Sequence, residues 1–108
     1  MKVENMTSNK GNKIANQFII RDNTHRYFQS YDSTIVKIEW FSEKELRHYE
    51  DQNHPTLETV VTKKVYLDEN RWDYSVTTGK YRNIFLGETK KETQKKIDND
   101  IYILTNLN

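Results

Sequence analysis

Hydrophobic and polar residues alternate along much of this chain, as they do in β-strands that bury one face. The alternation predicts a hairpin of two strands over 14–20 and 26–31, followed by a third strand over 34–40. A further segment rich in β-branched residues covers 59–68. The strand over 34–40 has the highest β-propensity, and one of its faces is apolar while the other is mixed. We therefore expect an antiparallel sheet with one face open to water.

The segment 42–58 departs from this alternation. Ser42 and Glu45 stand three residues apart, as in a capping box that starts a helix. Because Pro55 cannot continue a helix, we expect a short helix over about 43–51 and then a loop. The segment is interpreted as an insertion between two strands that would otherwise pair directly.

A helix is expected in the last third of the chain, where Thr77 or Thr78 can cap its start. Gly87 is well placed to end it, because the residue after a helix often adopts a left-handed conformation. Apolar residues spaced i, i+3 and i+4 form a stripe along this helix. Four residues are expected to face the sheet: Trp72, Tyr81, Ile84 and Phe85.

A second helix is expected over about 90–98. Thr89 and Glu92 form a capping box at its start. Its apolar face is thin, so this helix should lie on the surface. A last strand is expected over 101–107.

Together these elements predict an α+β fold, with an antiparallel sheet of about four to five strands and short helices packed on one side. The predicted order of elements is ββ(β)-α-β-α-α-β. Residues 1–13 are polar and are expected to form a flexible N-terminal arm. Residues 14–108 are expected to form a single domain.

The composition narrows the class of protein. Hydrophobic residues make up 34% of the chain and charged residues 31%, which approaches the composition of disordered proteins. Aromatic residues reach 12%, however, and each buried ring removes about 150–250 Å² from water, so we expect a small folded domain. The lack of cysteine fits a reducing cytoplasm. The chain has no run of about 18 apolar residues, so we expect no membrane span.

Known catalytic and metal-binding patterns are missing from the chain. The motif TTGK at 77–80 resembles the end of a phosphate-binding loop, but the first glycine and the final Ser or Thr are absent. His48 and His54 lie near acidic residues, and a solvated loop explains them better than a metal site. We therefore expect a protein that is not an enzyme and that uses no metal or cofactor.

Although the formal net charge is only +1, the chain contains two segments of opposite charge. Residues 42–58 hold five acidic and two basic side chains, whereas residues 80–96 hold six basic and two acidic ones. Surfaces of opposite charge can steer binding partners; the alternative is that the lysines only solvate a helix face. The candidate partner-binding residues are Glu43, Glu45, Glu50 and Asp51 in the acidic segment, and Lys80, Arg82, Lys90, Lys91, Lys95 and Lys96 in the basic one.

The run VYLDENRWDYSVTTGKYRNIFLGET, followed by YILTNLN, is the most distinctive part of the sequence. It resembles a family of small, functionally uncharacterised proteins carried by bacterial phages and other mobile elements. The similarity covers most of 10–41 and 64–108, and the segment 42–58 is extra in this chain. The resemblance implies the cytoplasm of a bacterial host, and it assigns no catalytic residue.

These observations favour a non-catalytic interaction protein that binds a host protein. One version of this hypothesis is an inhibitor of a host defence nuclease, of the anti-CRISPR or anti-restriction type, whose acidic segment meets a basic groove. The alternative hypothesis is a small nucleic-acid-binding accessory protein that uses the basic 80–96 face, because lysines neutralise phosphates and exposed tyrosines stack on bases.

Overall fold

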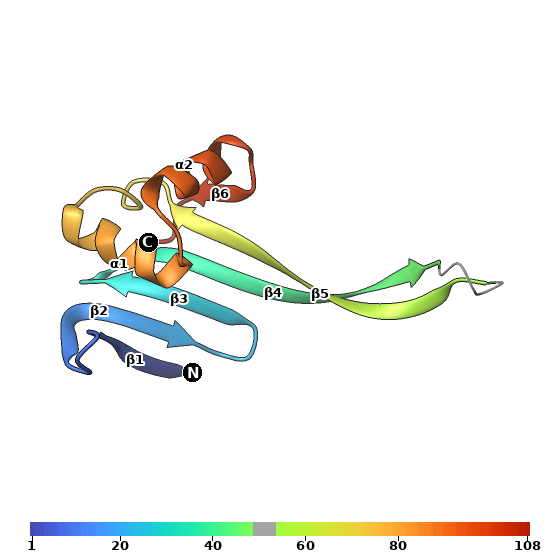
Figure 1. Cartoon of the computed structure of the whole chain (residues 1–108), viewed down its shortest axis with the longest axis horizontal. Helices are drawn as coiled ribbons and strands as arrows, with labels where there is room; N and C mark the ends of the chain where they lie inside the picture. Colours follow the sequence, from blue (N-terminus) through green and yellow to red (C-terminus); the bar gives the residue numbers. More distant parts are fainter. Residues whose placement is uncertain (49–53) are drawn as a thin grey trace.

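The computed structural model describes residues 1–48 and 54–108, and in them it shows an α+β fold with one sheet and two helices (Figure 1). The sheet has six strands in the described residues, more than the four to five predicted. The strands are β1 (Lys2–Thr7), β2 (Lys13–Arg21), β3 (His25–Ser30), β4 (Ser33–Arg47), β5 (Thr56–Asp68) and β6 (Tyr102–Thr105). The helices are α1 (Val76–Leu86) and α2 (Lys90–Asp98).

The strands lie side by side in chain order, from β1 to β6. Each pairs antiparallel with the next, except that β6 runs parallel to β5. A parallel neighbour needs a crossover connection, and here α1 and α2 form it. The predicted β2–β3 hairpin is confirmed, and the Asp22 carboxylate accepts hydrogen bonds from the backbone N–H of Thr24 and His25 in its turn.

The N-terminus is not the loose arm that was predicted from its polar composition. Residues 2–7 form β1, which pairs with β2 along one edge of the sheet. Gly11 adopts a left-handed φ of 80° in the turn between them. Polar side chains cost little on an edge strand because they remain in water, and Glu4 forms ion pairs with Lys2 and Arg21.

The helix predicted over 43–51 is also wrong. Strand β4 continues to Arg47 and pairs with β5 through twelve consecutive residues. A capping box is a local signal, and here the non-local pairing with β5 supplies the backbone hydrogen bonds instead. Residues 49–51 of the predicted helix lie outside the described residues.

The core lies between one face of the sheet and the two helices. Phe28, Val36, Ile38, Val65 and Leu67 are buried there. Paired residues of neighbouring strands share a face, so the pairs Phe28–Val36, Val36–Leu67 and Ile38–Val65 place these side chains together. We call this the helix-covered face and the opposite one the open face.

Helix α1 rests on the sheet through Phe85, whose ring stacks on Phe28 at 5.7 Å between centroids. Trp72 and Tyr81 also pack against the core, as predicted. Ile84 is exposed instead, because the buried residues of α1 include Thr78, Arg82 and Phe85, at i, i+4 and i+7. This stripe is rotated away from the one that hydrophobicity alone predicted.

The helix ends follow the capping signals closely. Ser75, rather than Thr77 or Thr78, caps α1 by accepting a hydrogen bond from the backbone N–H of Thr78. Gly87 ends α1 in the left-handed conformation, and the capping box of Thr89 and Glu92 starts α2. These two signals are confirmed, so the bounds of α2 agree with the prediction.

Candidate functional site

The most distinctive feature of the molecule is a β-hairpin that projects from the body (Figure 1). We define the arm as residues 41–47 of β4 and 56–62 of β5. Its seven cross-strand pairs, from Phe41–Thr62 to Arg47–Thr56, have no third strand beside them in the described residues. The molecule consequently measures 57 × 30 × 26 Å. Of the predicted insertion at 42–58, residues 42–47 and 56–58 therefore belong to the outer part of this ribbon.

One face of the arm carries three exposed apolar residues. Leu46 and Leu57 form a directly paired set across the two strands, and Val61 lies on the same face, level with Ser42. All three side chains are exposed. A single exposed leucine is ordinary, but a cross-strand pair of leucines on a thin ribbon is typical of a contact surface.

The opposite face of the arm is acidic. It carries two of the predicted residues, Glu43 and Glu45, together with Glu58, which is directly paired with Glu45. Arg47 bonds both Glu45, at 3.3 Å, and Glu58, at 3.8 Å. Glu50 and Asp51, also predicted for this surface, lie outside the described residues.

The predicted basic surface is smaller than its sequence suggested. Arg82 is only 1% exposed and therefore cannot belong to it. Its guanidinium donates to the backbone carbonyl of Trp72 and to the side-chain oxygen of Asn83, and burial lowers its pKa despite the nearby Asp73 carboxylate. The guanidinium packs over Gly79, where a Cβ would lie 3.7 Å from its nitrogens, at ordinary van der Waals distance.

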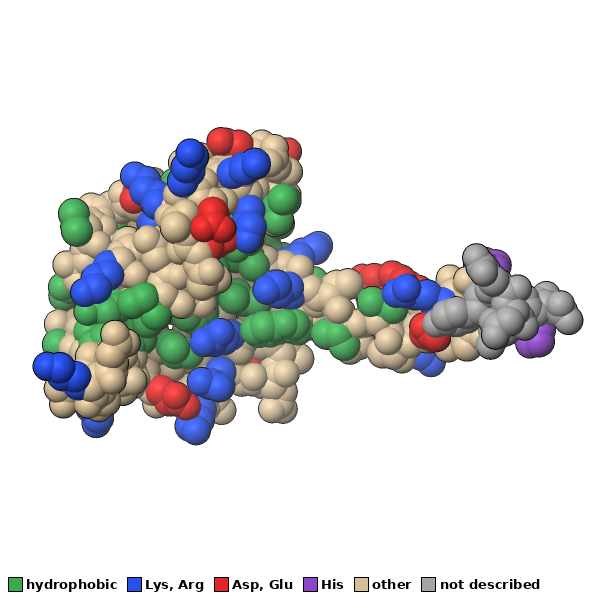
Figure 2. Space-filling view, in the orientation of Figure 1, with side chains coloured by type: hydrophobic (Ala, Val, Ile, Leu, Met, Phe, Trp, Pro, Cys, Tyr) green, Lys and Arg blue, Asp and Glu red, His purple; other side chains and the backbone are tan. Residues whose placement is uncertain are grey.

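Four of the five lysines in the predicted basic set are exposed, and Lys96 is partly so. Two are engaged in ion pairs: Lys90 bonds Asp73 at 2.6 Å, and Lys96 bonds Glu88 at 2.6 Å. Lys80 lies over the Tyr81 ring. Lys91 and Lys95 have no ion pair within the part of the chain that the structure describes, and basic side chains gather over α2 in Figure 2.

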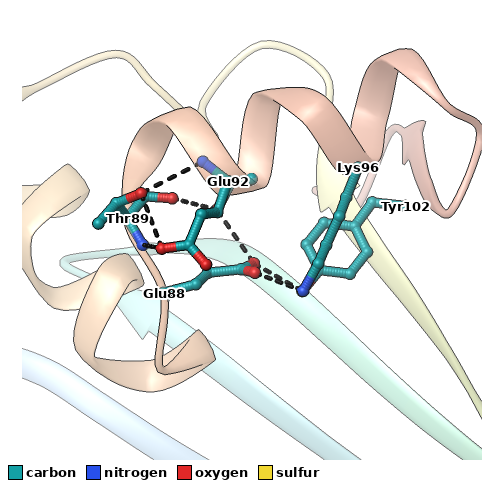
Figure 3. Close-up of polar contacts among 6 residues, drawn as sticks. Glu88, Thr89, Glu92, Lys96 and Tyr102 are labelled. Atoms are coloured by element: carbon teal, nitrogen blue, oxygen red, sulfur yellow. Dashed lines mark hydrogen bonds and ion pairs between the residues drawn. The ribbon is translucent and has the colours of Figure 1, made fainter.

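Lys96 belongs to a network that fastens α2 to β6 (Figure 3). The buried Glu88 carboxylate accepts hydrogen bonds from Lys96 and Tyr102, each at 2.6 Å, and from Thr93 at 3.1 Å. Burial raises the pKa of Tyr102 to about 12, and the Glu88 carboxylate adds to the rise. Burial opposes ionisation of Glu88, but these hydrogen bonds outweigh it and lower its pKa. We interpret this network as a structural contact that holds α2 against β6.

An open hollow of about 610 Å³ lies beside the start of α1. Asp73 lies in it between Lys90 and Arg82, at 2.6 and 3.6 Å, so these cations already have a carboxylate partner. The TTGK motif lies inside α1, where Thr78 is buried and its hydroxyl bonds that of Ser30 at 2.8 Å. The charged residues that line the hollow are therefore explained by their ion pairs with one another, without a bound ligand.

The open face of the sheet carries a row of six residues, one from each strand. Successive pairs connect Val3 to Ile20, Ile20 to Tyr27, Tyr27 to Lys37, Lys37 to Tyr66 and Tyr66 to Ile103. None of them belongs to the core cluster or packs against it. Sequence analysis did not identify this row, because its members become neighbours only through the strand register.

Compared with protein-family models, curated proteins and solved structures, the chain matches none of them. In residues 1–48 and 54–108, no helix has the length and hydrophobicity needed to cross a membrane. The same residues contain no group of three or more His, Cys, Asp or Glu placed to hold a metal ion.

Proposed function

We propose that this protein is a non-catalytic interaction module that binds a host protein through the arm. The observation that carries the proposal is a ribbon that exposes Leu46, Leu57 and Val61, beside which residues 1–48 and 54–108 place no third strand. An isolated two-stranded ribbon is at best marginally stable in water. A partner surface would both cover the leucines and stabilise the ribbon.

The charge of the arm supports a protein partner over a nucleic acid. Glu43, Glu45 and Glu58 share one face with a single basic residue, Arg47. Carboxylates repel phosphates, whereas they match a basic protein surface. We infer that the arm enters a basic groove, with its leucines on one wall and its carboxylates against the other.

The nucleic-acid groove of a nuclease is a surface of this kind. An arm that occupies it would block access of the nucleic acid, as the anti-CRISPR and anti-restriction hypotheses require. The resemblance to phage and mobile-element proteins supports this version, since such elements benefit from disabling a host defence nuclease. In this proposal the protein acts in the cytoplasm of a bacterial host.

Affinity purification from a lysate of a bacterial host tests the proposal. The bait is the tagged full chain, the test variant is Leu46→Lys with Leu57→Lys, and the matched control is Val76→Lys on the body, where the side chain is also exposed. We expect the same partner with wild type and control, and its loss with the arm variant. A partner retained by the arm variant would contradict the proposal.

The second candidate is nucleic-acid binding by α2. The observation in its favour is that Lys91 and Lys95, one helical turn apart, have no ion pair within the described residues. The burial of Arg82 and the ion pairs of Lys90 and Lys96 reduce the charge available to this surface.

A further inference from the structure

Three cations lie directly opposite one another on three neighbouring strands. Lys2 of β1 pairs with Arg21 of β2, and Arg21 pairs with Arg26 of β3. We call these three residues the basic row. They lie on the helix-covered face, because Arg26 also pairs with the buried Ile38. In Figure 2 basic side chains gather over this end of β1, β2 and β3. Like charges directly opposite each other in a sheet are destabilising, so the row weakens the isolated fold.

The basic row carries more positive charge than its neighbours neutralise. Within residues 1–48 and 54–108, one carboxylate bonds the row: Glu4 forms ion pairs with Lys2 at 3.1 Å and with Arg21 at 3.5 Å. Asp22 follows Arg21 in the chain, but its carboxylate accepts hydrogen bonds from two backbone N–H groups of its own turn. Three cations and the carboxylate of Glu4 leave a net charge of +2.

Arg26 is held in place but has no acceptor. Its guanidinium lies over the Phe85 ring, 4.6 Å from the ring centroid. The buried Nε of Arg26 has no hydrogen-bond partner in the part of the chain that the structure describes. Burial lowers the pKa of Arg26, and the charge of Arg21 lowers it further. Because the ring already orders this side chain, little conformational entropy is lost when an anion binds it.

We propose that the basic row binds a phosphate group that carries two negative charges. The net charge of +2 matches a phosphate monoester, which carries about −1.5 to −2 charges at pH 7. Arg21 and Arg26 lie on strands about 4.8 Å apart, so both guanidinium forks can donate to the oxygens of one phosphate. Lys2 adds a third donor. A carboxylate matches a single guanidinium fork and would leave the second arginine without an acceptor.

This phosphate site goes beyond the proposed function and is independent of it. The basic row lies on β1, β2 and β3, whereas the arm consists of parts of β4 and β5. Leu46 and Leu57, whose substitution tests the arm, have no part in the phosphate site. Failure of phosphate binding therefore leaves the proposed function standing, and failure to capture a host protein leaves the phosphate site standing.

Titration of the full chain with inorganic phosphate, followed by NMR of its backbone amides, tests the site. We expect saturable shifts that are largest around Lys2, Arg21 and Arg26. The melting temperature should rise with phosphate, because a ligand that binds the folded state stabilises it. Acetate at the same ionic strength should bind about tenfold more weakly, since it engages one arginine fewer. Equal binding of acetate, or shifts spread evenly over basic residues of the whole chain, would overturn the proposal.

Arg21→Gln and Arg26→Gln test the two arginines separately. Each removes one charged donor, so each should weaken phosphate binding about tenfold. Arg26→Gln also loses the contact with Phe85, and circular dichroism checks that it folds. The Arg21 side chain is 48% exposed, so Arg21→Gln decides the question even if Arg26→Gln does not fold.

The matched control is Lys10→Gln with Lys13→Gln. These two exposed lysines lie at the other end of the β1–β2 pair, so the control removes more charge than either arginine variant without touching the basic row. It should bind phosphate as the wild type does. Equal weakening by the control and by Arg21→Gln would show that net charge alone attracts phosphate, and would overturn the site.

The source of the phosphate is distinguished with a 5′-phosphorylated tetranucleotide and its 5′-hydroxyl form. Tighter binding of the phosphorylated form than of inorganic phosphate identifies the end of a nucleic acid as the source, and equal affinity identifies a free phosphate. The internal phosphodiesters carry one charge each, so the 5′-hydroxyl form should bind more weakly than either. Equal binding of the two tetranucleotides would overturn the proposal.

Discussion

Leu46 and Leu57 face each other across the arm, and the two residues are 63% and 58% exposed. Both residues lie beyond the last β3–β4 pair, so no third strand or helix covers them in the described residues. The hydrophobic effect favours burial of leucine side chains, so these two leucines do not stabilise the isolated molecule by their burial. Their placement is explained if the arm binds another protein.

Gln17 is expected to weaken the fold. It is fully buried, and neither its amide nitrogen nor its amide oxygen has a hydrogen-bond partner in the described residues. An unsatisfied buried polar group costs about 1–3 kcal/mol. Gln17→Leu should therefore raise the free energy of unfolding by about 1–2 kcal/mol in urea titrations.

Gln29→Leu is the matched control for this prediction. The Gln29 side-chain amide donates a hydrogen bond to the backbone carbonyl of Tyr31 at 2.8 Å, so its removal should bring no such gain. Equal stabilisation by the two substitutions would show that the burial of Gln17 is not the cause.

The buried Asp68 carboxylate fastens the C-terminal tail. It accepts hydrogen bonds from the backbone N–H of Leu107 at 2.8 Å and from the Asn108 side chain at 3.0 Å. Burial would raise the pKa of Asp68, but these bonds and that of the Asn70 N–H outweigh it and lower the pKa. Asp68→Asn should cost about 1–3 kcal/mol at pH 7.

The pH dependence of this variant follows from the lowered pKa. A carboxylate with a lowered folded-state pKa stabilises the protein above the unfolded-state value, near 3.8, and this stabilisation is lost as the pH falls through the folded-state value. The stability difference between wild type and Asp68→Asn should therefore be constant from pH 5 to 7 and shrink below about pH 4. A constant difference down to pH 2 would contradict the assignment.

The Glu88 network should appear in a tyrosine titration. Burial, together with the Glu88 carboxylate, holds the pKa of Tyr102 at about 12. In spectrophotometric titration we expect an ionisation near this value that is lost in Tyr102→Phe. Because the folded-state pKa exceeds the unfolded value near 10, the network stabilises the fold below pH 10 and loses this contribution as the pH rises toward 12.

Glu88→Gln isolates the charge of this network. It keeps the shape of the side chain but removes the carboxylate that bonds Lys96 and Tyr102. The Tyr102 titration should move toward 10, and unfolding should become easier by about 1–3 kcal/mol. An unchanged titration would mean that burial alone sets the pKa of Tyr102.

Local signals predicted much of this fold. The strand alternation located β2 and β3, and the capping box of Thr89 and Glu92 located α2. The capping box predicted from Ser42 and Glu45 was wrong, because the same residues pair with Val61 and Glu58 of a distant strand. Such pairing is non-local, so no short window of sequence contains it.

The candidate site was predicted only in part. The acidic segment was identified, but its shape as a ribbon with an apolar and an acidic face depends on the register of Leu46 with Leu57. The burial of Arg82 could not be predicted, since it depends on the Trp72 carbonyl and the Asp73 carboxylate, which the fold brings beside α1. Arginine is almost never fully buried unless paired.

Direct nucleic-acid binding predicts a different behaviour from arm-mediated binding. If α2 binds DNA, affinity should fall steeply with salt, and Lys91→Glu with Lys95→Glu should remove it while leaving the arm intact. We expect instead weak, salt-sensitive binding to single- and double-stranded DNA that Leu46→Lys with Leu57→Lys leaves unchanged. Fluorescence anisotropy with labelled oligonucleotides measures both, and tight binding at 150 mM salt would favour the alternative function.

Site-specific photo-cross-linking tests the central claim most directly. A photoreactive amino acid replaces Leu46 on the arm or, as the control, Val76 on the body, and each full-length protein is irradiated in host lysate. We expect one prominent cross-linked protein from position 46 that is absent from position 76 and that has a basic groove on its surface. Cross-links from position 76 but not from 46, or none from 46 to the protein that the wild type captures, would contradict it.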